Sequence, residues 1–133
     1  MRKAMPDTPL DTTAGLIDSA AVNTLASDVG IERLGLVLEA FCSELERRAP
    51  LLEAAINATD LAAIQRESHS LKGSALTFGA QALGAAARRA NDASRAGDVA
   101  GALEAGRAAL TLASPTLEAV RELIAEHAEH SLR

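Results

Sequence analysis

The sequence contains few aromatic side chains and a single cysteine. Aromatic residues make up 2% of its 133 residues, and Trp and Tyr are absent. Cys42, the only cysteine, can form neither an intrachain disulfide nor a zinc site built from several cysteines. No apolar run approaches the roughly 18 residues that span a bilayer, and no glycine-rich loop of the kind that binds nucleotide phosphates is present. These absences argue against a disulfide-stabilised scaffold, a membrane protein and an ATP-using enzyme.

Small apolar residues dominate what is present. Hydrophobic residues make up 48% of the chain, and much of this is alanine and leucine, whose helix propensity favours an all-α domain. The formal net charge is -5, which argues against a nucleic-acid binder, and both signs are interspersed as on solvated helix faces. A chain of this length suits one domain with a real core. We expect a cytoplasmic monomer that binds neither nucleic acid nor membranes.

Apolar residues recur at three- and four-residue spacing through most of the chain, which predicts amphipathic helices. Helices are expected at about 19–27, 31–56, 61–78, 80–96 and 98–127. Pro50 should kink the second of these helices near Arg48, and Pro115 should kink or divide the last one near Ala113. The predicted fold is an all-α, up-down-up-down four-helix bundle with a short additional N-terminal helix. We assign residues 1–16 to a flexible tail, 17–127 to the bundle and 128–133 to a frayed C-terminus.

One of the three histidines, His69, lies within the predicted helix 61–78. The inner stripe of this helix consists of Leu61, Ile64, Ser68, Leu71, Ala75 and Phe78. At about 100° per residue, His69 lies roughly 120° from the centre of that stripe, so its imidazole should be exposed. Lys72 and Gly73 follow three and four residues later and share the same outer face. The nucleophilic imidazole of His69, the cation of Lys72 and the position without a side chain at Gly73 are therefore expected side by side.

This combination suits the transfer of a phosphoryl group. Free imidazole has a pKa of about 6.5, so a neutral ring nitrogen can act as a nucleophile near pH 7. Lys72 can neutralise phosphoryl oxygens, and Gly73 leaves room for a bulky partner at a cost of about 1 kcal/mol in helix stability. Each residue alone also has an ordinary explanation, as a solvated histidine, a chance lysine and a glycine that packs against another helix.

A larger pattern surrounds this histidine. It comprises the run His-Ser-Leu-Lys-Gly-Ser-Ala at residues 69–75, then Gly79, Ala80 and Leu83, with Phe41, Glu44 and Asp60 earlier in the chain. The pattern resembles the signature of histidine-containing phosphotransfer (HPt) domains, and the resemblance extends over residues 18–125. It implies a four-helix bundle without kinase activity. Such a domain takes a phosphoryl group from the aspartate of one receiver domain and gives it to the aspartate of another in a multistep phosphorelay.

The resemblance also implies roles for particular residues. His69 is the phospho-accepting residue, Lys72 its charge-neutralising neighbour and Gly73 the clearance residue. Asn91 on the next helix is expected to orient the imidazole. Arg95, one turn further, is expected to contact the phosphoryl group or the partner.

The expected partners are receiver domains of response regulators and of hybrid histidine kinases. Leu76, beside the His69 face, is expected to be an apolar contact for them. The receiver is expected to supply magnesium and most of the catalysis, so this chain should need no cofactor and should not be an enzyme. Many members of the family carry an acidic residue where Arg88 and Arg89 stand. This difference puts the choice of partner in doubt, and it does not affect the chemistry of transfer.

Two other functions fit parts of the sequence. A phosphate-independent adaptor could keep the fold and dock receivers, although such a protein would be expected to lose His69. A metal- or cofactor-binding bundle would need inward-facing His or Glu residues, whereas the predicted inner stripes are almost wholly apolar. His127 and His130 have a spacing that can bind a metal, but they lack an evident third ligand and we interpret them as a polar helix end.

Overall fold

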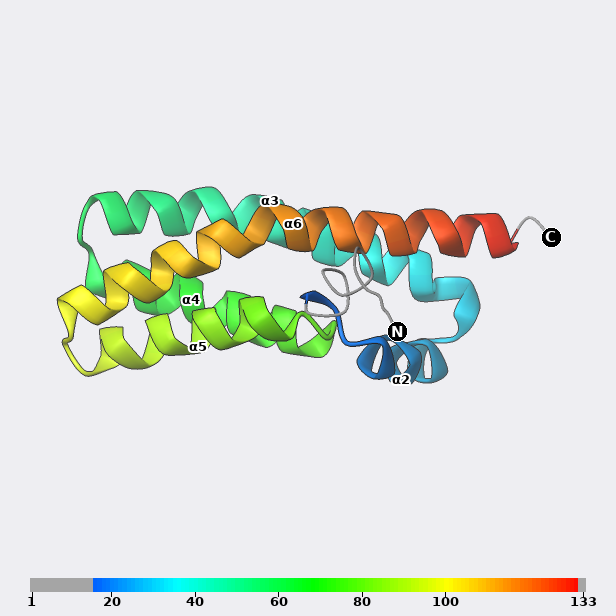
Figure 1. Cartoon of the computed structure of the whole chain (residues 1–133), viewed down its shortest axis with the longest axis horizontal. Helices are drawn as coiled ribbons and strands as arrows, with labels where there is room; N and C mark the ends of the chain where they lie inside the picture. Colours follow the sequence, from blue (N-terminus) through cyan, green and yellow to red (C-terminus); the bar gives the residue numbers. More distant parts are fainter. Residues whose placement is uncertain (1–15, 132–133) are drawn as a thin grey trace, which may run out of the picture.

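The computed structural model describes residues 16–131, with side chains through residue 129, and these residues form an all-α bundle (Figure 1). The helices are α2 (Ser19–Val29), α3 (Ile31–Asn57), α4 (Leu61–Thr77), α5 (Gln81–Arg95) and α6 (Val99–Ser131). The described residues contain no strand, so the predicted all-α fold with a short additional helix before four long ones is confirmed. Apart from Leu16, the predicted tail lies outside the described residues.

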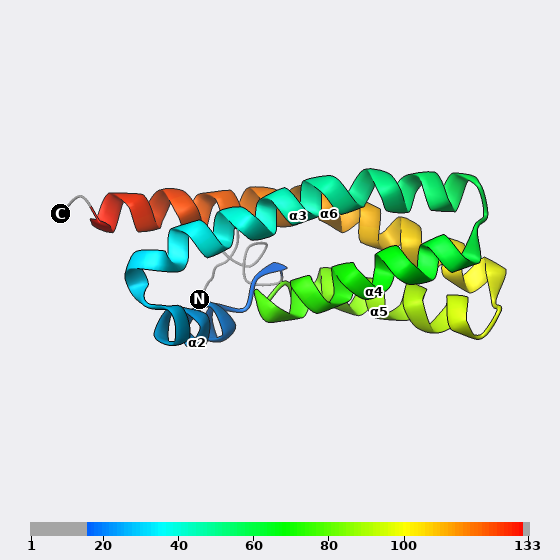
Figure 2. The ribbon, with the colours of Figure 1, turned by 180° about the vertical axis from the view of Figure 1, so that it is seen from behind.

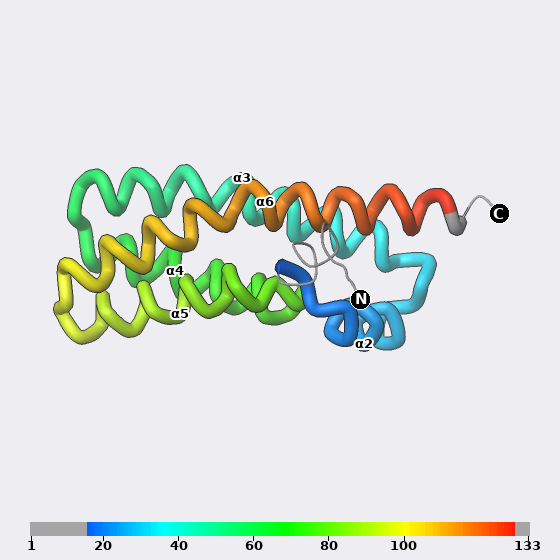
Figure 3. Tube along the Cα trace, viewed as in Figure 1, coloured from blue at the N-terminus to red at the C-terminus, as the bar shows by residue number. Residues whose placement is uncertain are grey.

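The four long helices pack as two pairs. α3 lies along α6, and α4 lies along α5 (Figures 1 and 2). Contacts between α5 and α6 and between α3 and α4 join the pairs. The Cα trace shows that α3 and α6 extend past one end of the α4–α5 pair, where α2 lies (Figure 3). None of the helices in the described part of the chain has an apolar stretch long enough to cross a membrane.

Aspartates begin three of the helices. Asp60 accepts a hydrogen bond from the Ala63 backbone N–H at 3.1 Å, and Asp98 accepts one from Gly101 at 3.0 Å. Asp18 caps α2 through the Ala20 N–H at 3.0 Å. Each carboxylate satisfies a backbone donor that has no partner within its helix, so these short side chains determine where each helix starts.

The connection between α4 and α5 also holds α2 in place. Gly79 and Gly97 follow the ends of α4 and α5 with φ of 76° and 75°, a conformation that glycine adopts without a steric penalty. The Asp18 N–H donates to the Gly79 carbonyl at 2.7 Å, and Gln81 Nε2 donates to Asp18 Oδ2 at 3.0 Å. Two long-range hydrogen bonds therefore fasten the start of α2 to the turn that follows α4.

Both prolines lie inside continuous helices. α3 runs through Pro50, and α6 runs through Pro115, so the predicted alternative that Pro115 divides the last helix is wrong. The ribbon of α6 does change direction along its length (Figure 1). A proline removes one hydrogen bond, and packing of the apolar faces on both sides of it can hold the helix together. α6 continues to Ser131, beyond its predicted end at residue 127.

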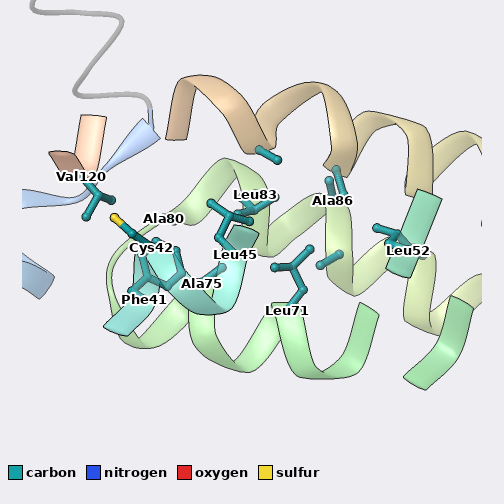
Figure 4. Close-up of a cluster of buried hydrophobic side chains, with 14 of the residues drawn as sticks. Phe41, Cys42, Leu45, Leu52, Leu71, Ala75, Ala80, Leu83, Ala86 and Val120 are labelled. Atoms are coloured by element: carbon teal, nitrogen blue, oxygen red, sulfur yellow. The ribbon is translucent and has the colours of Figure 1, made fainter. Parts of the chain in front are cut away.

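The core lies between the four long helices (Figure 4). α3 supplies its largest side chains, and α5 and α6 supply mainly alanines, which let the helices approach closely. Phe41 stacks on Phe78 with ring centroids 4.7 Å apart. Cys42 is buried among these residues, and desolvation by this burial raises the pKa of its thiol. The predicted inner stripe of α4 is mostly buried, and Phe78 and Leu61 lie at its edges.

Candidate functional site

His69 lies on the outer face of α4, as the helical spacing predicted. Its neighbours in sequence on the inner face, Ser68 and Leu71, are 0% and 1% exposed. The Asp60 cap sets the start of α4, and burial of the inner stripe sets its rotation about its axis. Together they place the imidazole in solvent, where a protein partner can reach it.

The two residues predicted to flank the histidine lie on the same side of the helix. Lys72 is half-buried and Gly73 is exposed. A Cβ added at Gly73 would meet no atom within 4 Å, apart from the nearby backbone of its own helix. Gly73 therefore does not serve close packing between helices, and the space beside it is open to a partner.

A hollow between α4 and α5 contains His69. Its other lining residues are Ala62, Gln65, Arg66 and Ser70 from α4 and Asn91 and Arg95 from α5. Asn91 is 3% exposed, whereas Arg95 is exposed. The structure thus brings the predicted pair Asn91 and Arg95 together with His69, although they are more than twenty positions apart in the chain.

The other predicted residues lie outside this hollow. Lys72 and Gly73 lie one turn beyond His69, and Leu76 lies two turns beyond it with 52% of its surface exposed. Leu76 also sets the spacing of α4 and α5, because a Cβ at Gly84 would lie 2.8 Å from Leu76 Cδ2. Arg88 is exposed, pairs with Asp92 at 3.9 Å and does not line the hollow.

A buried carboxylate beneath the site was not predicted from the sequence. Glu67 is 4% exposed, and its Oε1 accepts from Arg48 Nη1 of α3 at 2.9 Å. Arg48 Nε also donates to Glu44 Oε2 at 2.7 Å, and Arg47 donates to the other oxygen of Glu44 at 2.7 Å. These two arginines lower the pKa of the Glu44 carboxyl. The inner face of α4 is therefore not wholly apolar, and an ion pair ties it to α3.

Arg66 was also missed. It precedes His69 by one turn, lines the same hollow, and its Nε donates to Glu67 Oε2 at 3.2 Å. Spacing could have identified it, because residues three apart on a helix share a face. Glu67 gave a weaker signal, since its position three residues after Ile64 and beside Ser68 places it at the edge of the inner stripe. Which cation of another helix would meet that carboxylate could not be predicted from spacing.

Metal ligands do not cluster in the described part of the chain. Among these residues there is no group of three or more His, Cys, Asp or Glu placed to hold a metal ion. His127 is partly buried in α6 near Gly35 of α3, and a Cβ at Gly35 would lie 3.2 Å from His127 Cδ2. The side chain of His130 lies outside the described residues.

Comparison with known proteins gives three similarities. The family model described as "Hpt domain" matches residues 36–130. Phosphorelay protein LuxU from two strains of Vibrio vulnificus is 35% identical over 68 residues, which are 51% of this chain and 59% of that protein. The crystal structure of histidine-containing phosphotransfer protein B (HptB) from Pseudomonas aeruginosa PAO1 superposes with a TM-score of 0.69 at 24% identity, covering 86% of this chain and 95% of the other. The last similarity concerns the fold.

Proposed function

We infer the function from one premise, namely that this chain belongs to the Hpt domain family. We propose that it is a histidine phosphotransfer protein of a multistep phosphorelay. His69 accepts a phosphoryl group from the aspartate of one receiver domain and passes it to the aspartate of another. Response regulators and hybrid histidine kinases are the proposed sources of these receiver domains, and the chain acts as a cytoplasmic monomer.

The observation that carries this proposal is the setting of His69. An exposed imidazole stands beside open space at Gly73, with Lys72 one turn away and Arg66 and Arg95 in the same hollow. A phosphoryl group brings dense negative charge, which such cations stabilise. The ring is exposed, so the aspartyl phosphate of a partner can approach it.

The transfer step balances without a further reactant. An unprotonated nitrogen of His69 donates its lone pair to phosphorus, while the bond from phosphorus to the aspartyl oxygen breaks and the carboxylate leaves with that electron pair. The ring releases the proton of its other nitrogen to solvent. The reverse sequence delivers the group to the next receiver. In this proposal the chain is a carrier, and the receiver supplies magnesium and most of the catalysis.

The test is phosphate uptake from a phosphorylated receiver domain. The wild-type chain should gain a label that is labile to acid and stable to base, as expected for a phosphoramidate bond. His69→Gln should gain none, whereas His127→Gln, a matched histidine variant on α6, should label as the wild type does. Labelling of His69→Gln would show that the proposed acceptor is wrong.

The same variants distinguish the alternative adaptor function. An adaptor would bind the receiver equally with or without His69 and would carry no phosphate. Binding of a receiver by wild-type chain that remains unlabelled after incubation would therefore favour the adaptor over the relay.

A further inference from the structure

The hollow around His69 has an uneven charge distribution. It contains two guanidinium groups, Arg66 from α4 and Arg95 from α5, and none of the described residues that line it is acidic. Arg66 precedes His69 by one turn of α4 and Lys72 follows it by one turn, so both cations share a face of the helix with the imidazole. A group bound to His69 would therefore meet a cation from each direction along α4.

Arg66 is held in place by the buried carboxylate of Glu67. Glu67 Oε1 accepts from Arg48 Nη1 at 2.9 Å, and its Oε2 accepts from Arg66 Nε at 3.2 Å. The side chain of Glu67 is 6% exposed and that of Arg66 is 67% exposed. The carboxylate is thus fixed between α3 and α4 by Arg48, and it holds the inner end of a guanidinium whose outer end faces solvent.

The outer end of Arg66 remains available. Its contact with Glu67 uses Nε, and within residues 16–129 its two terminal nitrogens make no hydrogen bond or ion pair. A guanidinium presents parallel N–H groups that match the spacing of phosphoryl oxygens. A phosphoryl group has three such oxygens, and the ring of His69 lies one helical turn away from Arg66.

We propose that Arg66 contacts the phosphoryl group carried by His69, and that Glu67 is a positioning residue that acts through Arg66. This inference rests on the proposed function. It assigns Arg66 to the phosphoryl group and not to an acidic surface of the partner. A probe that contains no partner protein therefore separates the two sources of an arginine effect.

Phosphoramidate is that probe. An unprotonated ring nitrogen attacks phosphorus, the bond from phosphorus to the amine nitrogen breaks, and ammonia leaves with the electron pair. Ammonia then takes up the proton that the other ring nitrogen releases. The rate at which His69 gains phosphate from phosphoramidate, followed by intact-mass spectrometry, reports on this hollow without any receiver domain.

Arg66→Gln should slow this labelling about fivefold, which is near the upper limit for one exposed charge contact. Arg66→Lys should keep part of the rate, because it keeps the charge but not the paired N–H groups. Arg107→Gln is the matched control, since Arg107 is an exposed arginine of α6 that does not line the hollow. It should label at the wild-type rate.

The role of Glu67 is tested by a double-mutant cycle. Glu67→Gln alone should slow labelling about twofold, and it should have no further effect when added to Arg66→Gln, because its influence passes through Arg66. An equal slowing in both backgrounds would overturn the positioning role. If Glu67 contributed only to stability, Glu67→Gln would lower the melting temperature, and its effect on the labelling rate would not depend on whether Arg66 is present.

Two failures can be told apart. Labelling of Arg66→Gln at the wild-type rate, with His69 still the labelled residue, overturns the assignment of Arg66 and leaves the proposed function standing. Absence of label on the wild type from both phosphoramidate and a phosphorylated receiver overturns the proposed function, and the assignment of Arg66 falls with it.

Discussion

Replacing Gly73 by alanine tests the open space beside the helix at this position. The structure predicts that this small substitution stabilises the fold. Gly73 lies in the interior of α4, has an ordinary helical φ, and a Cβ would meet nothing within 4 Å. Glycine in a helix interior is about 0.8–1.0 kcal/mol less favourable than alanine. Gly73→Ala should therefore raise the free energy of unfolding by about 1 kcal/mol, which corresponds to roughly 3–5 °C in melting temperature for a domain of this size.

Gly106 is the matched control on α6, and there the expected sign is opposite. A Cβ at Gly106 would lie 2.8 Å from Ile56 Cδ1 and 3.2 Å from its Cγ1. Ile56 is 3% exposed, and its β-branched side chain is restricted to few rotamers in a helix. Overpacking of this kind costs about 1–3 kcal/mol. The gain in helix propensity offsets about 1 kcal/mol of this cost. Gly106→Ala should therefore lower the free energy of unfolding by about 1 kcal/mol.

Urea unfolding followed by far-ultraviolet circular dichroism measures both changes, and the absence of Trp and Tyr makes fluorescence unsuitable. A loss of stability in Gly73→Ala would refute the reasoning, since it would mean that α4 needs glycine for its own structure. Gly73→Gln adds the functional half of the test. It should leave the fold intact and slow transfer from a receiver domain, and an unchanged transfer rate would remove the clearance role.

Two further predictions concern charged residues. Lys72→Ala should slow phosphoryl transfer to His69 by about tenfold, the size of one lost charge-assisted contact in the transition state, with unchanged helix content. Equal rates would exclude Lys72 from the step. The lowered pKa of the Glu44 carboxyl means that its ion pairs stabilise the fold above the ordinary pKa of a glutamate, and that this stabilisation is lost as the pH falls through the lower pKa of the folded state. The stability difference between wild type and Glu44→Gln should therefore shrink on acidification, and a constant difference would contradict the ion pairs with Arg47 and Arg48.

The elements of the site could be predicted because they depend on local rules. The three-and-four spacing turned His69 outward, and Lys72 and Gly73 followed from their distance in sequence. The exposure of His69 and Gly73 is confirmed, and the open space at Gly73 decides between the clearance and packing explanations. The chemical roles of these residues stay predictions until transfer is measured.

The starts of the helices were predictable for the same reason, whereas the end of α6 and its continuation through Pro115 were not. Asp60 and Asp98 act on backbone donors within three residues, so their effect can be recognised locally. Whether a helix survives a proline depends on how well its two halves pack on other helices. That information lies outside the local sequence, and α3 and α6 both continue.

The amino-acid sequence by itself determined the helices and the outward direction of His69, since both depend on spacing along one helix. The motif at residues 69–75 also indicated the Hpt domain family. Only the tertiary structure decided what surrounds the imidazole. Asn91 and Arg95 reach the hollow because α5 packs against α4, and Arg66 is oriented because Glu67 is buried against Arg48 of α3. A buried charge must find its partner in space, and the spacing of residues along the chain does not say which helix will provide it.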